Sequence, residues 1–335
     1  TTSSDLFGMF LCLEAVMLTA AFLVAAKGDL SARQASSKYL GLNVCGSVLL
    51  LAGLVGIYMR AGSSNLVRLS QLLPNAVELY PTSMRAFTAM LVGGLAIKSA
   101  LFPLHTWLPD AHGSAATPSS VVISGLLVKA GVVFLIRVIG WTLPIDFIYT
   151  LPLRQILMVM SSLAILGGSL MALRQTDIKR MLAYSTAAQV GYIFLGLGLM
   201  VEKSLIGAVY HIANLAVVKG MLVLAAGSIM KLTGRRRIAD FAGVGRHFPL
   251  PMAIFTIGAF SMIGVPPLSG FVSKWYLGLG ALEAGHPIFV IILLISSVLN
   301  ALYYLPIAIS AFFGQGSNIE QHMELPFGAK AAMVL

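Results

Sequence analysis

The stretch Ala86-Phe-Thr-Ala-Met-Leu-Val-Gly-Gly-Leu-Ala-Ile-Lys98-Ser-Ala-Leu-Phe-Pro103 carries a lysine in an apolar run that ends at a proline. Such a run predicts a membrane-spanning helix, where a charge at mid-bilayer costs roughly 2.5–3.5 kcal/mol. Further helix-length apolar segments carry lysines in a similar way, namely Lys129, Lys219 and Lys274. Because such costly charges mark ion pathways, these lysines predict that the protein moves protons or other ions.

The composition places the whole chain in a membrane. Hydrophobic residues make up 58% of it and charged residues 10%. Runs such as 40–58 and 287–314 are long enough to cross about 30 Å of hydrocarbon. We therefore predict an all-α polytopic membrane protein whose residues 1–335 form a single transmembrane domain. The lipid bilayer is then its surroundings. The formal charge of +10 sits mostly in short loops, which argues against a nucleic-acid partner.

We expect nine spanning helices, at about 6–26, 38–59, 85–103, 119–140, 154–173, 182–200, 204–231, 250–280 and 287–313. Loops after the odd helices hold Lys27, Arg33, Lys38, Arg174, Lys179, Arg180, Lys231, Arg235, Arg236, Arg237 and Arg246. Loops after the even helices, with the membrane edge, hold Arg60, Arg68, Arg85, Arg137, Arg154 and Lys203. The positive-inside rule predicts a multi-pass protein of the cell inner (plasma) membrane, with the Thr1 end outside.

Both ends look cut. The chain begins at Thr1 rather than at a methionine, and 331–335 reads like the start of another helix. We expect a fragment that lacks N-terminal helices and the C-terminal end of a longer protein.

Two of the expected helices are broken beside a lysine. The third runs into Pro103 after Lys98, and the eighth is interrupted at Gly264-Val-Pro-Pro-Leu-Ser-Gly270 before Lys274. A proline frees a backbone carbonyl, which a membrane protein tolerates where other groups satisfy it. The two helices are five positions apart in order, so equivalent helices would run in opposite directions. We therefore predict inverted five-helix repeats with two broken transmembrane helices.

Glu14 is the one acidic residue deep in an expected helix, and Lys98 is its expected partner, because an unpaired carboxylate there is costly. The pair would set how firmly Lys98 holds its proton; a static structural pair is the alternative. His211 and Lys219 share a helix about two turns apart, so water would have to join them. A satisfied core histidine is the alternative for His211.

The remaining polar positions also leave alternatives open. Lys129 could reach toward the membrane interface instead of joining a relay, and Lys274 could be a membrane-edge anchor. His105, Asp110 and His112 are placed on a short loop. Cys12 and Cys45 are expected to be small core residues, and their spacing indicates no metal site. No Walker motif, dinucleotide fingerprint or nucleophile triad is present, so we expect no cofactor.

Three motifs resemble one known family. They are Leu101-Phe-Pro-Leu-His-Thr-Trp-Leu-Pro-Asp-Ala-His112 with Thr117-Pro118, Asp177-Ile-Lys-Arg-Met-Leu-Ala-Tyr-Ser185, and Gly264-Val-Pro-Pro-Leu-Ser-Gly-Phe-Val-Ser-Lys274. Together they are similar to the antiporter-like subunits of respiratory complex I, Mrp-type sodium/proton antiporters and membrane-bound hydrogenases. The resemblance implies about fourteen helices in two inverted repeats, of which this chain looks like helices five to thirteen.

The resemblance also assigns roles. Glu14 resembles the family's glutamate, Lys98 its broken-helix lysine, Lys129 and Lys219 its central lysines and Lys274 its exit-side lysine. His211 matches the first histidine of a His-x-x-Asn-His-x-x-x-Lys pattern, and Leu215 stands at the second. Segment 273–285, and Ser124 with Lys129, look closest to the Mrp D-type and hydrogenase-associated branch.

We therefore expect a proton-translocating subunit of a multisubunit complex, with Na⁺ as a second candidate ion and other membrane subunits as partners. The expected proton relay comprises Glu14, Lys98, Lys129, His211, Lys219 and Lys274. Any driving reaction, of the NADH dehydrogenase or hydrogenase type, would belong to the partners. Two alternatives are a stand-alone transporter of an organic solute and a structural or quinone-site subunit of a redox enzyme.

Overall fold

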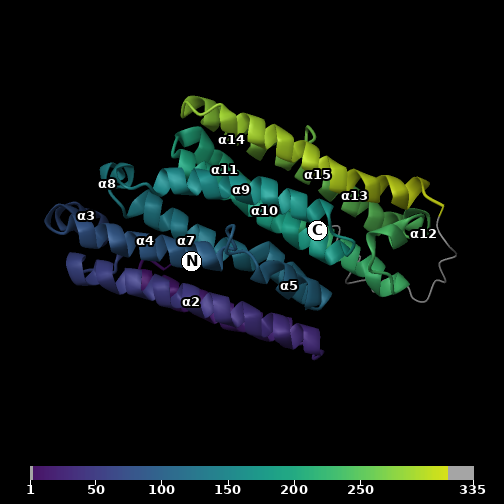
Figure 1. Ribbon diagram of the computed structural model, residues 1–335, viewed down its shortest axis with the longest axis horizontal. Helices are drawn as coiled ribbons and strands as arrows, with labels where there is room; N and C mark the ends of the chain where they lie inside the picture. The colour runs from purple at the N-terminus through teal and green to yellow at the C-terminus, as the bar shows by residue number, and fades with distance from the viewer. Residues whose placement is uncertain (1–2, 316–335) are drawn as a thin grey trace.

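The computed structural model describes residues 3–315, without the side chain of Ile145, as an elongated bundle of helices that run along its long axis (Figure 1). Thr1 and 331–335, for which expectations were stated, lie outside the described residues. The long helices are α1 (Leu6–Ala25), α2 (Leu30–Ala61), α4 (Pro81–Lys98), α7 (Val128–Trp141), α9 (Leu153–Leu173), α10 (Ile178–Leu199), α11 (Glu202–Thr233), α13 (Pro249–Ile263), α14 (Ser269–Glu283) and α15 (Ile288–Phe313). The short ones are α3 (Leu66–Leu79), α5 (Trp107–Ser114), α6 (Thr117–Val122), α8 (Ile145–Thr150) and α12 (Val244–His247).

Within the described residues, seven helices are long and apolar enough to cross a membrane. They correspond to seven of the nine expected segments. One of them, Thr117–Trp141, consists of α6, a π-helix at Ile123–Leu127 and α7. The other two expected segments, 85–103 and 250–280, are the ones that the structure breaks.

The two predicted breaks are present. Helix α4 ends at Lys98, and α5 begins at Trp107 after an irregular segment in which Ala100 has a φ of 54°. Helix α13 ends at Ile263, and α14 begins at Ser269. Each break therefore opens a helix next to a lysine of the predicted relay. The inverted-repeat relation between the two halves stays a prediction.

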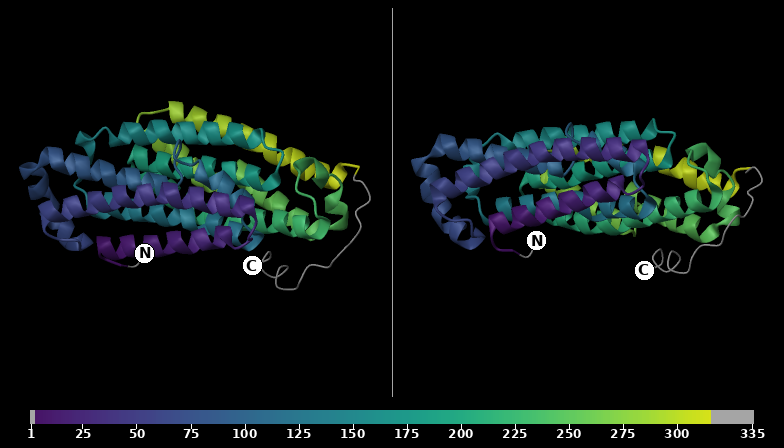
Figure 2. Two further views of the ribbon diagram at one scale, coloured as in Figure 1. Left: turned by 60° about the horizontal axis from the view of Figure 1, so that its bottom comes forward. Right: turned by 90° about the horizontal axis from the view of Figure 1, so that it is seen from below.

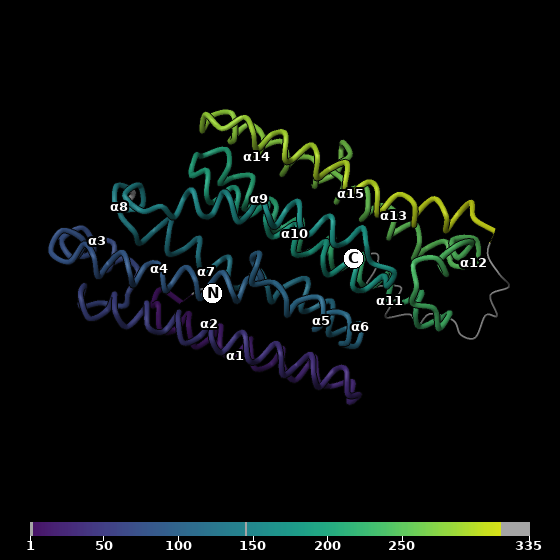
Figure 3. The backbone as a smooth tube through the Cα atoms, in the orientation of Figure 1, coloured from purple at the N-terminus to yellow at the C-terminus, as the bar shows by residue number. Residues whose placement is uncertain are grey.

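Helix α10 occupies the centre of the bundle, since 94% of its most apolar window is buried inside the protein. Helices α1 and α2 lie at one edge, and α14 and α15 lie at the opposite edge (Figures 1 and 2). The tube in Figure 3 shows α10 and α11 between them. A polar group within this window of α10 is therefore shielded from lipid, whereas α15, with 28% of its window buried, presents most of its surface outward.

Aspartates fix where several helices begin. The carboxylate of Asp29 accepts the backbone N–H of Ala32 at 2.7 Å, and that of Asp177 accepts the N–H of Arg180 at 3.0 Å. Both are N-caps, which satisfy backbone donors that a helix start leaves free. A hydrogen bond from Lys27 is the main reason that the pKa of Asp29 is lowered to about 2.

Three expectations about local structure are wrong. His105, Asp110 and His112 do not share a loop: Asp110 and His112 lie on α5, and both histidines are buried. Segment 60–84, expected as a loop, contains α3, which buries Leu66, Leu69, Leu73 and Ala76 along one face. Cys12 and Cys45 are exposed rather than in the core, because their helices turn these positions outward.

Candidate functional site

Lys98 and Glu14 form the ion pair that the sequence predicts. The Lys98 Nζ lies 2.9 Å from the Glu14 carboxylate, and the two side chains are 3% and 20% exposed. Ser47 of α2 joins them, because it donates to Glu14 at 2.8 Å and accepts from Lys98 at 2.8 Å. Three helices thus place one positive and one negative charge where α4 breaks. The role of this pair in transport stays a prediction.

Lys129 points into the bundle rather than toward the membrane interface. It is 5% exposed, and its ammonium group donates to the backbone carbonyl of Ser124. That carbonyl belongs to the π-helix, whose wider turn weakens the regular hydrogen-bond ladder and is often found at functional positions. The Ser124 hydroxyl in turn lies 3.1 Å from the Thr186 hydroxyl of α10.

Lys219 is completely buried at the centre of the bundle. Its Nζ donates to the Ser185 hydroxyl at 2.7 Å, the Tyr304 hydroxyl at 3.1 Å and the Leu182 carbonyl at 3.3 Å. The Thr186 hydroxyl also donates to the Leu182 carbonyl, at 2.8 Å. Lys219 therefore binds the Leu182 carbonyl of α10 directly, and Lys129 is linked to it through Ser124 and Thr186.

Lys274 reaches back into the second break. Its Nζ donates to the carbonyls of Met262 at 2.9 Å and Ile263 at 2.8 Å, and to the Ser297 hydroxyl at 3.1 Å. These carbonyls end α13, where the helix dipole favours a positive charge. Lys274 therefore binds inside the protein rather than at the membrane edge.

His211 is not next to Lys219. Its Nδ1 lies 2.9 Å from the Ser273 hydroxyl, and its ring lies 5.2 Å from the ring of Tyr192. Its hydrogen bond therefore goes to the residue before Lys274, and the expected water link to Lys219 stays untested.

The lysines fall into two groups. Lys129, Lys219 and Lys274 are connected through backbone carbonyls and serine, threonine, tyrosine and asparagine side chains. Within residues 3–315, the hydrogen bonds of Lys98 do not connect it to Lys129 in this way. Packing still brings them near: a Cβ built on Gly131 would lie 2.6 Å from the Ser99 hydroxyl and 3.6 Å from the Lys98 Cβ. A water or a rearrangement of the break would be needed to join the two groups.

Sequence reasoning missed several polar residues that contact the lysines. Lys179, counted above as a loop cation, is 4% exposed on α10, and its Nζ donates to the Ala115 carbonyl at 2.7 Å. The others are hydroxyl and amide side chains in apolar helices. The clearest signal for them is a polar residue that recurs every three or four positions, as at Asn300, Tyr303 and Tyr304.

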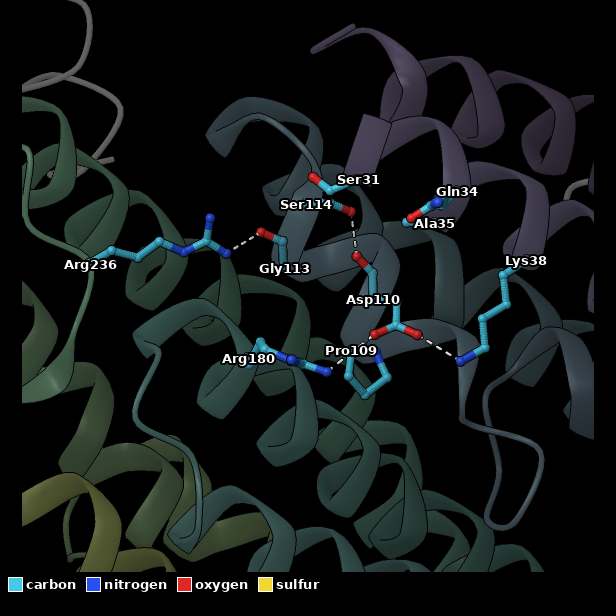
Figure 4. Close-up of a pocket in the computed structure, with 10 residues that line it drawn as sticks. All are labelled: Ser31, Gln34, Ala35, Lys38, Pro109, Asp110, Gly113, Ser114, Arg180 and Arg236. Atoms are coloured by element: carbon cyan, nitrogen blue, oxygen red, sulfur yellow. Dashed lines mark hydrogen bonds and ion pairs between the residues drawn. The ribbon is translucent and has the colours of Figure 1, made fainter. Parts of the chain in front are cut away.

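We call the buried side chains of Lys98, Lys129, Lys219 and Lys274 the lysine row. A polar pocket of about 400 Å³ lies outside this row, between α2, α5 and α10 (Figure 4). At its floor Asp110 binds Lys38 at 2.6 Å and Arg180 at 3.3 Å. Arg236 points in from the other side and donates to the Gly113 carbonyl. Because Asp110 of α5 pairs with Lys38 of α2 and Arg180 of α10, we interpret these residues as a structural contact that holds the three helices together.

The residues described offer no group of three or more histidine, cysteine, aspartate or glutamate side chains that could hold a metal ion. The chemistry available to the row is therefore that of ammonium, imidazole, hydroxyl and carboxylate groups. Such groups bind and release protons.

Comparison with known proteins identifies relatives over nearly the whole chain. Residues 3–300 match the family model described as the transmembrane part of NADH:quinone oxidoreductase and Mrp antiporter subunits. NADH-quinone oxidoreductase subunit N of Desulforudis audaxviator is 40% identical over 92% of the chain and 61% of its own length. The D-type subunit of the Na⁺/H⁺ antiporter of Alkalihalophilus pseudofirmus is 30% identical over 97% of the chain and 65% of its own length.

Solved structures agree. A chain of the archaeal membrane-bound sulfane sulfur reductase superposes with a TM-score of 0.91 at 32% identity, over 99% of this chain and 67% of that one. A chain of the Mrp complex from a Dietzia species gives 0.87 at 28% identity, over 95% of this chain and 59% of that one. The chain thus spans about three fifths of the length of the curated relatives it matches. Because these relatives include both complex I and Mrp proteins, the branch stays a prediction.

Proposed function

Because the chain belongs to the family of membrane subunits shared by NADH:quinone oxidoreductases and Mrp antiporters, we propose that it is a proton-translocating subunit of a multisubunit membrane complex. The chain is a multi-pass membrane protein. We place it in the plasma membrane with its N-terminal end outside, as the loop charges suggest.

One observation carries this proposal: the buried lysines lie on a series of neighbouring helices that extends from one edge of the bundle to the other. Lys98 ends α4 near the α1–α2 edge, Lys219 lies on central α11, and Lys274 lies on α14 at the opposite edge. Each is 9% exposed or less. Groups that can each hold or release a proton, placed on neighbouring helices, support proton transfer from helix to helix as well as along the helix axes.

The geometry also suggests what each residue does. Glu14 and Ser47 hold Lys98 as a charged pair at the first break. Lys129 and Lys219 receive protons at the centre, where the carbonyls of Ser124 and Leu182 and the hydroxyl of Ser185 orient their ammonium groups. Lys274 receives them at the second break, where the α13 carbonyls favour its protonated form.

The same row argues for protons rather than Na⁺ within this chain. Several positive charges in a low-dielectric interior repel a metal cation, whereas a lysine can hand its proton on and become neutral. Na⁺ would need clustered oxygen ligands, and the deep carboxylate of Glu14 is already paired. If the full complex exchanges Na⁺, we propose that another subunit carries it.

The experiment is proton transport by the full-length protein with its co-purifying subunits, reconstituted into vesicles that contain a pH-sensitive dye. Lys219→Ala should lower the initial rate about 100-fold, as expected when a proton-transferring group is lost. Lys203→Ala is the matched control, because Lys203 is half exposed and forms an ion pair with Glu283 at the surface. Equal rates in both variants would favour the solute-transporter or structural alternatives.

A further inference from the structure

Lys219 and Lys274 are joined by a continuous set of hydrogen bonds that bypasses His211. From Lys219 the bonds run to the Ser185 hydroxyl at 2.7 Å and then to the Tyr303 hydroxyl at 3.0 Å. Tyr303 also bonds the Asn300 side-chain oxygen. The Asn300 amide donates to the Met262 carbonyl at 3.1 Å, and Lys274 donates to that same carbonyl at 2.9 Å.

We call this set of hydrogen bonds, from Lys219 through Ser185, Tyr303, Asn300 and the Met262 carbonyl to Lys274, the bridge. Its side chains are shielded from solvent and lipid. Ser185, Asn300 and Lys219 are 0% exposed, and Tyr303 is 5% exposed. The bridge also involves five helices, since Ser185 is on α10, Lys219 on α11, the Met262 carbonyl on α13, Lys274 on α14, and Tyr303 and Asn300 on α15. A buried polar network of this kind is favourable only when its donors and acceptors match.

Whether the donors and acceptors of this bridge match depends on the direction in which the Tyr303 hydroxyl hydrogen points. Tyr303 has a single hydroxyl hydrogen but two acceptors within reach, the Asn300 oxygen and the Ser185 oxygen. When Lys219 is charged, it donates to Ser185 and Tyr304, whose hydroxyls lie 2.9 Å apart. Ser185 then needs no hydrogen bond from Tyr303, and Tyr303 can donate to Asn300. When Lys219 is neutral, its lone pair can accept from the Ser185 hydroxyl, whose oxygen then accepts from Tyr303.

We propose that Tyr303 is a positioning residue whose hydroxyl hydrogen switches from Asn300 to Ser185 when Lys219 loses its proton. The loss of the Tyr303 hydrogen bond alters how Asn300 binds the Met262 carbonyl. Lys274 senses this alteration because it donates to the same carbonyl. Tyr303 keeps its hydrogen throughout, so the only proton that leaves is that of Lys219. This inference rests on the proposed function and names the residues that couple two steps of it.

The bridge explains why Asn300 is suited to this place. An amide does not readily pass a proton on, so it keeps protons from crossing directly and transmits only a change of hydrogen bonding. Other titratable groups also face the bridge and would modulate it. Tyr304 accepts from Lys219 at 3.1 Å, and the Tyr192 ring lies 5.1 Å from the Lys274 Nζ and 5.2 Å from the His211 ring. Lys129 is linked to the Lys219 end through Ser124, Thr186 and the Leu182 carbonyl.

The test is infrared spectroscopy of the reconstituted full-length protein with isotope-labelled tyrosine, recorded as the pH is raised. A tyrosine band that shifts in the wild type and is lost in Tyr303→Phe is assigned to Tyr303. We expect the shift to be abolished in Lys219→Met. In Lys219→Arg, which keeps a fixed charge, the band should stay at its low-pH position.

Two controls separate this inference from the proposed function. Tyr210→Phe removes an exposed hydroxyl from α11 and Ser161→Ala a buried one from α9, and both should keep the shift. Transport should fall about 3- to 30-fold in Tyr303→Phe, the range for one member of a coupling network, and stay normal in the controls. A Tyr303 band that still shifts in Lys219→Met, or no band lost in Tyr303→Phe, would overturn the inference. The infrared result stands whether or not protons are transported.

Discussion

At the scale of single residues, the protein places the carboxylate of Glu14 against Lys98, one of five lysines that are buried within residues 3–315. Glu14 shares Ser47 with Lys98 and is too far along the chain to be a local partner. Breaking a buried ion pair by removing one member typically costs about 3–5 kcal/mol, because the other charge is left without compensation. The remaining lysines have hydroxyls and carbonyls instead of carboxylates, so Lys98 is the residue most tightly controlled by an opposite charge.

Removing the carboxylate should therefore disable Lys98. Glu14→Gln is expected to lower proton transport, and Glu14→Gln combined with Lys98→Ala should be no worse than Lys98→Ala alone. The measurement is transport by the four members of this double-mutant cycle, with assembly followed by co-purification. Effects that simply add would mean that the two residues act independently.

Lys274 offers a second test at this scale. Lys274→Arg keeps a positive charge for the α13 carbonyls, but an arginine does not release its proton at physiological pH. We expect its transport rate to be almost as low as that of Lys274→Ala, with assembly unchanged. Full activity of the arginine variant in vesicles would assign Lys274 a fixed-charge role and remove it from the relay.

The sequence could predict the lysines and the Glu14 partner, because charges in apolar helices are rare and conspicuous. It could not predict Ser47, Ser185 or Tyr303, because serine and tyrosine are ordinary residues in such helices and only the packing brings them to a lysine. His211 shows the same limit. Its spacing from Lys219 suggested one partner, whereas the packing of α11 against α14 gave it Ser273.

At the scale of elements, the break between α13 and α14 depends on a close approach of backbones. A Cβ built on Gly270 would lie 1.7 Å from the Ser261 carbonyl oxygen, so no side chain fits there. Gly264, with a φ of 94°, ends α13 in a conformation that L-residues rarely adopt. The glycines thus let α14 start beside the last turn of α13 and aim Lys274 at its carbonyls.

Gly270→Ala should destabilise this region by about 1–3 kcal/mol, as overpacking usually does. Gly278→Ala is the matched control on the same helix, because a Cβ there meets no atom within 4 Å. Alanine at position 278 should be neutral or slightly stabilising. Thermal unfolding of both variants in detergent is the measurement, and equal melting temperatures would contradict the described packing.

Long apolar runs and their breaks could be predicted element by element, since hydrophobic length and proline position are local signals. The helices α3 and α5 could not. Helix α3 is too short and too amphipathic to register as a span, and α5 looked like a polar loop because His112 and Asp110 lie close in sequence. Both segments are helical because packing against the rest of the bundle buries one face of each, and this packing is not visible in the sequence.

At the scale of the whole molecule, the loop charges predict an orientation that labelling can test. After Cys12 and Cys45, which are both exposed, are replaced by serine, Ser31→Cys should react with a membrane-impermeant reagent from the cytoplasmic side. Lys203→Cys should react from the outside. Intact cells and inverted vesicles provide the two sides, and the reverse pattern would invert the proposed topology.

In the proposed relay, Lys98 is the member at the first break, where it ends α4. The most direct measurement is therefore proton transport by Lys98→Ala in the full-length protein with its co-purifying subunits. We expect the assembled variant to lose proton transport while Lys203→Ala keeps it. Near-normal transport by an assembled Lys98→Ala variant would contradict the proposed relay.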